Sequence, residues 1–305
     1  MAAAQDLIER ATRQLESVIL SKQQQIKLSI ACLLANGHLL LEDLPGMGKT
    51  TLAMALAKVF SLPFNRVQFT SDLLPADLLG GNIFNPKENQ FNLQKGPIFT
   101  ALLLADELNR ATPKAQSALL QAMEESNVSI DGTTYLLPEP FFVIATQNPN
   151  DQAGTYPLPE SQLDRFLISL SLGFPDREQE RLLLKGNVGR EQLRTLQTVI
   201  AKDHLLYMQK QVKSITISDP VLDYIQTLVR ETRDSTETIM GISPRGAVAL
   251  AMTARAWAYI EGRSYLLPED VATVFPFVTH HRMVLRESSD KHHWIRQLLN
   301  NIPKI

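Results

Sequence analysis

A glycine-rich turn lies between an apolar run at residues 38–42 and a helical pattern at residues 49–60. The turn reads Leu44-Pro45-Gly46-Met47-Gly48-Lys49-Thr50. Backbone N–H groups at the start of a helix point outward and attract anions, and glycine lets the backbone approach a phosphate group closely. The pattern therefore predicts a phosphate-binding loop, in which Lys49 contacts the β- and γ-phosphates of a nucleotide and the Thr50 hydroxyl binds Mg²⁺. The predicted loop residues are Asp43, Leu44, Pro45, Gly46, Met47, Gly48, Lys49, Thr50 and Thr51.

The strict form of this loop begins with glycine, and this chain has Asp43 at that position. Aspartate adopts left-handed backbone angles more readily than most residues, so we expect the loop to form with Asp43 in place of glycine. The alternative interpretation is a plain strand-to-helix turn that contains Gly-Lys-Thr by chance. A second half of a nucleotide site elsewhere in the chain would decide between the two.

Two acidic residues, Asp106 and Glu107, follow the apolar run at residues 102–105. We expect Asp106 to hold Mg²⁺, mostly through water, and Glu107 to polarise the water that attacks the γ-phosphate. The alternative is an exposed loop start, but four apolar residues direct the acids toward the carboxyl edge of a sheet. Both halves of a nucleotide site are therefore present in the sequence.

These groups need a scaffold, and residues 1–175 alternate strand-like apolar runs with helical patterns. The expected strands cover residues 38–42, 66–70, 101–106, 141–146 and 167–172. This order predicts a doubly wound α/β core with five parallel strands, which binds ligands at the carboxyl ends of its strands. Hairpin inserts are expected at residues 82–94 and 128–136, where Asp131-Gly132 suits a type I′ turn.

After residue 175 the pattern is almost entirely helical. The expected helices cover residues 176–185, 190–211, 219–233 and 244–262, and a further one begins at Pro268. Ser243 can cap the helix that Pro244 opens. We therefore predict an α/β core at residues 1–175 and an α-helical lid domain at residues 176–305.

Composition excludes several classes of protein. The 305 residues carry 30 basic and 32 acidic side chains, a net charge of -2, which argues against a constitutive nucleic-acid binder. One cysteine excludes an internal disulfide and a cysteine-rich zinc site. The apolar stretch at residues 28–41 is shorter than the roughly 18 residues that a membrane helix needs. We expect a cytoplasmic protein with neither a signal peptide nor a membrane span.

Several motifs in this order resemble the AAA+ ATPases and, within them, the MoxR family. The matching segments are Glu42-Asp43-Leu44-Pro45-Gly46-Met47-Gly48-Lys49-Thr50, Ala105-Asp106-Glu107-Leu108-Asn109-Arg110-Ala111, Ala122-Met123-Glu124-Glu125, Ala145-Thr146-Gln147-Asn148-Pro149, Gly154-Thr155-Tyr156-Pro157-Leu158-Pro159-Glu160 and Gln162-Leu163-Asp164-Arg165-Phe166. They cover residues 36–175 densely and the helical tail sparsely. The Glu-Asp opening of the phosphate loop is usual for this family.

The resemblance implies roles for three residues outside the loop. Asn148 matches sensor 1, although a turn asparagine before Pro149 is the alternative. Arg165 matches the arginine finger, which reaches the nucleotide of a neighbouring subunit. Without the resemblance, Arg165 would be a surface arginine paired with Asp164 or Glu160. Arg245 matches sensor 2.

The resemblance also implies an activity and partners. We expect hydrolysis of ATP with Mg²⁺ by a homo-oligomeric ring, a hexamer. A protein with a von Willebrand A domain would be the partner, and a client enzyme complex would be matured, or receive its metal or cofactor, in the manner of a chaperone. The alternatives are a motor subunit of a magnesium-chelatase type and a DNA-acting helicase or clamp-loader motor. Where the family has Gly-Gln near the base, this chain reads Val18-Ile19-Leu20-Ser21-Lys22, which leaves base recognition open.

Two further features have competing interpretations. His280-His281 and His292-His293 suggest a metal site, but adjacent side chains on one helix diverge and no acidic cluster accompanies them. We therefore expect no metal there. Phe84 and Phe91 on the first insert could grip a partner in a central pore, but we expect them to pack on the sheet.

Overall fold

A five-stranded parallel sheet forms the centre of the computed structural model, which describes residues 2–149, 154–185, 190–286 and 290–304. The strand order is β2-β5-β8-β1-β9. The strands are β1 (Leu39–Glu42), β2 (Phe64–Gln68), β5 (Leu102–Asp106), β8 (Phe142–Gln147) and β9 (Ile168–Leu170). The five predicted parallel strands are confirmed. Strand β2 begins two residues before the expected start at residue 66, because Phe64 pairs with Leu102.

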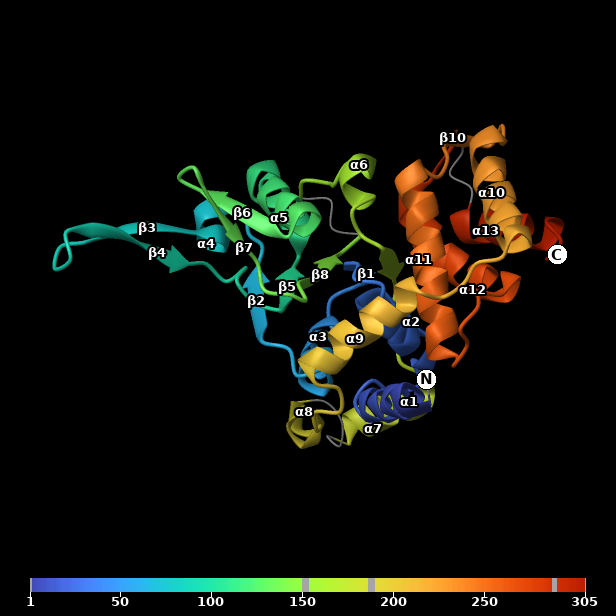
Figure 1. Ribbon diagram of the computed structural model, residues 1–305, viewed down its shortest axis with the longest axis horizontal. Helices are drawn as coiled ribbons and strands as arrows, with labels where there is room; N and C mark the ends of the chain where they lie inside the picture. Colours follow the sequence, from blue (N-terminus) through green and yellow to red (C-terminus); the bar gives the residue numbers. More distant parts are fainter. Residues whose placement is uncertain (1, 150–153, 186–189, 287–289, 305) are drawn as a thin grey trace.

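Helices cover both faces of this sheet (Figure 1). The helices of this part of the chain are α1 (Ala2–Glu16), α2 (Gln23–Leu34), α3 (Lys49–Val59), α4 (Pro75–Leu79), η1 (Leu108–Arg110), α5 (Pro113–Glu125) and α6 (Glu160–Leu163). Alternate residues of one strand enter different hydrophobic cores: Leu102 and Leu104 lie in one and Leu103 in the other. Burial on both faces explains why the strands read as unbroken apolar runs.

Two antiparallel hairpins are inserted in the core, as expected. The first joins β3 (Gly80–Asn85) to β4 (Gln90–Lys95), and the second joins β6 (Asn127–Ile130) to β7 (Thr133–Leu136). Asp131 and Gly132 both have positive φ angles, of 49° and 79°, as a type I′ turn requires. The hairpin β3–β4 projects far from the sheet (Figure 1).

The expectation that Phe84 and Phe91 pack on the sheet was wrong. They form a cross-strand pair on the projecting hairpin, with ring centroids 5.4 Å apart. Their exposed fractions are 46% and 69%. The hairpin is too far from the sheet for its aromatic rings to reach the core, so the rings stabilise each other instead.

The remainder of the chain is helical except for a short two-stranded ribbon. Its elements are α7 (Arg177–Leu184), α8 (Arg190–Thr195), α9 (Lys202–Lys213), α10 (Asp219–Asp234), β10 (Thr238–Met240), α11 (Pro244–Ile260), α12 (Pro268–Thr279), η2 (His280–Arg282), β11 (Val284–Leu285) and α13 (Lys291–Asn301). Ser243 caps α11 as expected, because its Oγ accepts a hydrogen bond of 2.9 Å from the Gly246 N–H. In the described part of the chain, no helix combines the length and the apolar character that crossing a membrane requires.

The single helix expected at residues 190–211 was wrong, because residues 196–201 separate α8 from α9. The N–H groups of Val199 and Ile200 donate to the Val59 carbonyl at 2.9 and 3.0 Å. Val59 is the last residue of α3, and the carbonyls in the last turn of a helix have no partner within that helix. Capping α3 and burying Leu196 and Ile200 therefore favour a break that helical periodicity does not reveal.

Candidate nucleotide site

The loop between β1 and α3 has the backbone conformation that a phosphate-binding loop needs. Gly46 and Gly48 have φ angles of 86° and 88°. A Cβ atom built on either glycine meets no atom within 4 Å, so the left-handed conformation rather than space requires glycine. Gly48 is also the N-cap of α3 and has no side chain to cap it. The first N–H groups of α3 are therefore open to an anion.

Asp43 does not stand in for glycine in the way the sequence suggested. It is not among the residues with positive φ, so the expectation of a left-handed Asp43 was wrong. Its side chain is buried, with 6% exposed, and its carboxylate accepts hydrogen bonds from residues 171–173 rather than facing the loop. A conformation open to any residue lets aspartate occupy this position.

Lys49 is held at the base of the loop. Its Nζ donates to the Asp43 carbonyl at 2.6 Å and to the Gln147 carbonyl at 3.4 Å. Burial lowers the pKa of Lys49, while the negative charges of Asp43, Asp106 and Glu107 oppose that shift. The ammonium group thus lies at the ends of β1 and β8, where phosphate oxygens could replace the carbonyls as acceptors.

Asp106 ends β5 and receives hydrogen bonds on both oxygens. Its Oδ1 accepts from Thr146 Oγ1 at 2.6 Å, and its Oδ2 accepts from Arg66 Nη2 at 2.7 Å and Nε at 3.1 Å. The carboxylate is 12% exposed as a side chain. Arg66 lies on β2, the neighbouring strand, and supplies the charge that balances Asp106.

Glu107 follows directly with a left-handed backbone, φ 56°. Its N–H donates to Thr146 Oγ1 at 2.9 Å, so one hydroxyl contacts both acidic residues. Its Oε2 accepts from Gln68 Nε2 at 2.6 Å and lies 3.3 Å from Arg110 Nε. These contacts fix the direction of the carboxylate that we expect to act on water.

One cleft of about 350 Å³ brings most of the predicted residues together. Its lining includes Pro45, Gly46, Gly48, Lys49, Thr50, Thr51, Arg66, Gln68, Asp106, Glu107 and Asn148. No role was predicted for Arg66, Gln68 or Thr146. The roles of Arg66 and Gln68 could have been predicted, because they are polar residues at alternate positions of β2. Alternate residues of a strand point to the same side.

The oxygen donors of this cleft suit Mg²⁺. The Thr50 hydroxyl and the Asp106 carboxylate are hard oxygen ligands, and Mg²⁺ usually combines one or two protein carboxylates with substrate phosphates and water. Among the described residues, no group of three or more His, Cys, Asp or Glu side chains could hold a metal. His280 and His292 stack with centroids 4.4 Å apart, and burial lowers the pKa of His280 to about 4.

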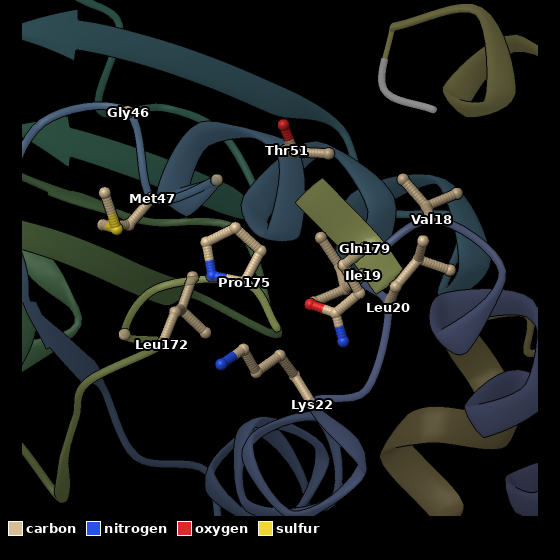
Figure 2. A pocket seen from close by; sticks show the side chains of 12 residues that line it. Val18, Ile19, Leu20, Lys22, Gly46, Met47, Thr51, Leu172, Pro175 and Gln179 are labelled. Carbon is tan, nitrogen blue, oxygen red and sulfur yellow. The ribbon is translucent and has the colours of Figure 1, made fainter. Parts of the chain in front are cut away.

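An apolar pocket of about 210 Å³ adjoins the loop. Val18, Ile19 and Leu20 lie on one side of it, and Met47, Leu172 and Pro175 lie across from them (Figure 2). Lys22 Nζ donates to the Phe174 carbonyl at 3.0 Å. The segment that departs from the family pattern therefore presents apolar side chains where a flat aromatic group could lie.

Arg165 and Arg245 do not line this cleft or this pocket. Both form ion pairs with Glu124 on α5, Arg165 Nη2 to Oε2 and Arg245 Nη2 to Oε1, each at 3.1 Å. The alternative partner Asp164 is occupied by others: it accepts from Arg282 Nε at 2.6 Å and from Ser243 Oγ at 2.9 Å. The structure thus brings the two predicted arginines to each other.

Comparison with known proteins identifies the family of both parts of the chain. The model of the ATPase family associated with various cellular activities (AAA) matches residues 38–168, and that of the AAA lid domain matches residues 230–302. The fold and the cleft together define a P-loop protein with a helical lid.

The chain is 45% identical over 279 residues to the uncharacterized protein YeaC of Bacillus subtilis, with 92% of this chain and 87% of that protein covered. It is 38% identical over 295 residues to chaperone MoxR1 of Mycobacterium tuberculosis, with 93% and 78% covered. The crystal structure of a proposed ATPase from Cytophaga hutchinsonii, 35% identical, superposes with a TM-score of 0.90 over 100% of this chain and 96% of that one. The chain belongs to the MoxR family of AAA+ ATPases.

Proposed function

We propose that this protein hydrolyses ATP to ADP and phosphate with Mg²⁺ bound. The observation that carries the proposal is one cleft that holds the loop lysine, Asp106 and Glu107 beside an apolar pocket. The base occupies the apolar pocket, and the triphosphate lies over residues 46–51. Thr50 and Asp106 would hold Mg²⁺, which would supply positive charge beside the phosphates.

The chain's own groups then act on the attacking water. Glu107 accepts a proton from that water and directs it toward the γ-phosphate, and the Asn148 amide orients it from the end of β8. Lys49 exchanges its carbonyl partners for phosphate oxygens and stabilises the charge that develops on them. With Mg²⁺ bound, Asp106 would contact both Arg66 and the metal.

Arg165 and Arg245 complete the site of a neighbouring subunit. They share Glu124 and line neither cavity of their own chain, which supports a role in trans for both. A site completed in this way requires a closed ring, and we propose a hexamer. In the single subunit, Glu124 is the anion that binds both arginines. In the proposed ring, a phosphate group of the neighbour's nucleotide would take over that role.

We further propose that the ring remodels a partner protein in the cytoplasm. The relative named chaperone MoxR1 supports a chaperone-like role. The partner would contain a von Willebrand A domain, and the client would be an enzyme complex that is matured or receives a metal or cofactor. The domains proposed for this work are the core at residues 1–175 and the lid at residues 176–305.

The test of the activity uses Glu107→Gln with Lys49→Ala as its control. Glu107→Gln should retain ATP binding and lose about 10² to 10⁴ in turnover, because only the proton acceptor is removed. Lys49→Ala should lose binding as well. Phosphate release and equilibrium ATP binding separate the two variants, and wild-type turnover by Glu107→Gln would sink the assignment of Glu107.

The partner is tested with the same variants as baits. Glu107→Gln holds ATP without turning it over, so its ring should retain a bound partner in a pull-down of the native complex. A von Willebrand A domain protein should be enriched over the Lys49→Ala bait. If such a protein is recovered equally with both baits or with neither, the proposed partner is wrong, whatever the ATPase activity.

A further inference from the structure

Asp43 contacts two parts of the nucleotide site. Its carbonyl accepts from Lys49 Nζ at 2.6 Å. Its carboxylate accepts three hydrogen bonds from consecutive residues: Ser171 Oγ at 2.7 Å, Leu172 N–H at 2.5 Å and Gly173 N–H at 3.1 Å. A buried carboxylate with three donors is a strong fixed contact.

The segment that Asp43 holds is a wall of the apolar pocket. Leu172, Gly173 and Pro175 line that pocket. Leu172 and Pro175 lie opposite Val18 to Leu20 (Figure 2). Gly173 has a φ angle of 63°, and a Cβ atom built on it meets nothing within 4 Å. The wall therefore takes its shape from a main-chain conformation, and two of the main-chain N–H groups that define it are bound by Asp43.

We propose that Asp43 is a positioning residue for the base-binding wall, so that it sets the affinity for the base of a nucleotide and not for its phosphates. The inference rests on the proposed function. Two groups of Asp43 act on the site: the carbonyl accepts the hydrogen bond of Lys49, and the carboxylate shapes the base pocket and adds a negative charge near Lys49. A change of the side chain alone leaves the first contact in place.

A second pair one step along the same strands provides a matched control. Ser169 Oγ donates to Glu42 Oε2 at 2.6 Å, which is the same serine-to-carboxylate contact between β9 and β1. Ser169 and Glu42 line a different cavity, of about 550 Å³, between the sheet edge and the helices α12 and α13. Ser169→Ala therefore removes an equivalent hydrogen bond away from the base pocket.

The experiment compares ATP, ADP and inorganic tripolyphosphate, each with Mg²⁺, by calorimetric titration of the full chain. Asp43→Asn keeps the backbone carbonyl but places an NH₂ group against N–H donors. It should raise the Kd for ATP and ADP about tenfold or more and leave the Kd for tripolyphosphate within about twofold. Ser171→Ala should raise the ATP Kd about threefold, and Ser169→Ala should change neither Kd.

The outcomes separate this inference from the proposed function. Equal loss of ATP and tripolyphosphate binding would mean that Asp43 acts on the phosphate loop, and unchanged ATP binding would mean that it positions nothing; either overturns the inference. Wild-type protein that binds neither ATP nor ADP would instead overturn the proposed function. If Asp43→Asn does not fold, Ser171→Ala tests the inference instead. The Ser171 side chain is exposed, and removing its hydroxyl leaves the two main-chain hydrogen bonds to Asp43 in place.

Discussion

The hydroxyl of Thr146 lies behind the nucleotide cleft and contacts both of its acidic residues. It is fully buried at the end of β8, donates to Asp106 Oδ1 and accepts from the Glu107 N–H. Asp106 and Glu107 are adjacent in sequence but have different expected tasks, one toward the metal and one toward water. A single hydroxyl that contacts both therefore fixes their relative orientation.

Thr146→Val should lower the ATP turnover number about tenfold or more, with the Kd for ATP changed less than about threefold. Valine has the same shape but leaves Asp106 and the Glu107 N–H without their partner, at a cost of about 1–3 kcal/mol in the free energy of unfolding. Steady-state phosphate release, nucleotide titration and urea unfolding measure the three quantities. Thr134→Val, the same substitution on the hairpin β6–β7, is the control and should change none of them.

An unchanged turnover number in Thr146→Val, with the expected loss of stability, would show that the hydroxyl stabilises the strand ends without orienting the acids. A large rise in the Kd for ATP would also contradict the prediction. In that case Thr146 would support the phosphate loop instead.

At the residue scale, a role is predictable when it depends on residues that are adjacent in sequence. It is not predictable when it depends on a contact between residues that are distant in sequence. Lys49 and Thr50 are recognisable because the loop and the helix start are contiguous in sequence. Glu124 received no role because its two arginine partners lie 41 and 121 positions further along the chain. The conformation of Asp43 was misjudged, since its acceptor role only exists once β9 lies beside β1.

The strands were predictable because apolar residues are continuous where both faces of a strand are buried. The break between α8 and α9 was not, because it depends on the carbonyl of Val59, more than 130 positions earlier in the chain. The ribbon of β10 and β11 was missed for a similar reason, since Thr238 pairs with Leu285 across the intervening helices. Local patterns specify an element, but its ends depend on what it packs against.

His38 connects three elements of the core and must be neutral to do so. Its Nδ1 accepts from the Val143 N–H of β8 at 3.0 Å, and its Nε2 donates to the Met123 carbonyl of α5 at 3.1 Å. A ring that accepts on one nitrogen and donates on the other has a single proton. Burial lowers the pKa of His38 from 6.5 to about 4.

Acid should therefore destabilise the protein through His38. The folded-state pKa lies below the unfolded-state pKa, so the stabilisation is fully present above pH 6.5 and is lost as the pH falls toward 4. Between pH 6.5 and 5 the loss should be about 2 kcal/mol in the free energy of unfolding. Urea unfolding at several pH values should show a smaller decrease for His38→Gln, which can still donate and accept but does not titrate.

Burial also lowers the pKa values of His280 and His281. The pH dependence of the wild-type free energy of unfolding therefore includes their contribution. The difference between wild type and His38→Gln isolates His38. His204→Gln, on an exposed position of α9, is the control and should keep the wild-type slope. An identical pH dependence in His38→Gln and wild type would contradict the prediction.

On the scale of the whole molecule, the lid and the segment that carries Arg165 form one unit. Arg282 is buried and donates to Asp164, to the Phe166 carbonyl at 2.6 Å and to the Leu167 carbonyl at 3.1 Å. Ser243, which caps α11, also donates to Asp164. Arg165 and Arg245 are thus anchored to the same network from either side, and a movement of the lid would carry both.

This geometry predicts how inactive subunits should complement each other. Lys49→Ala subunits lack the proposed phosphate lysine, and Arg165→Ala subunits lack the proposed arginine finger, so each variant should be inactive alone. Mixed in equal amounts, about a quarter of the interfaces would combine an intact loop with an intact finger, and about a quarter of the wild-type turnover should return. Lys49→Ala mixed with Arg245→Ala should recover to the same extent if Arg245 acts on the neighbour as proposed.

The mixture of Arg165→Ala with Arg245→Ala separates the possible arrangements. If both arginines act in trans, each site needs Arg165 and Arg245 from the same neighbouring subunit. Every subunit in this mixture lacks one of the two, so the mixture should stay inactive. If Arg245 acts on its own nucleotide and Arg165 on the neighbour's, the same mixture should recover while Lys49→Ala with Arg245→Ala should not. Phosphate release after subunit exchange measures all three mixtures, and the pattern of recovery assigns each arginine to its own or the neighbouring site.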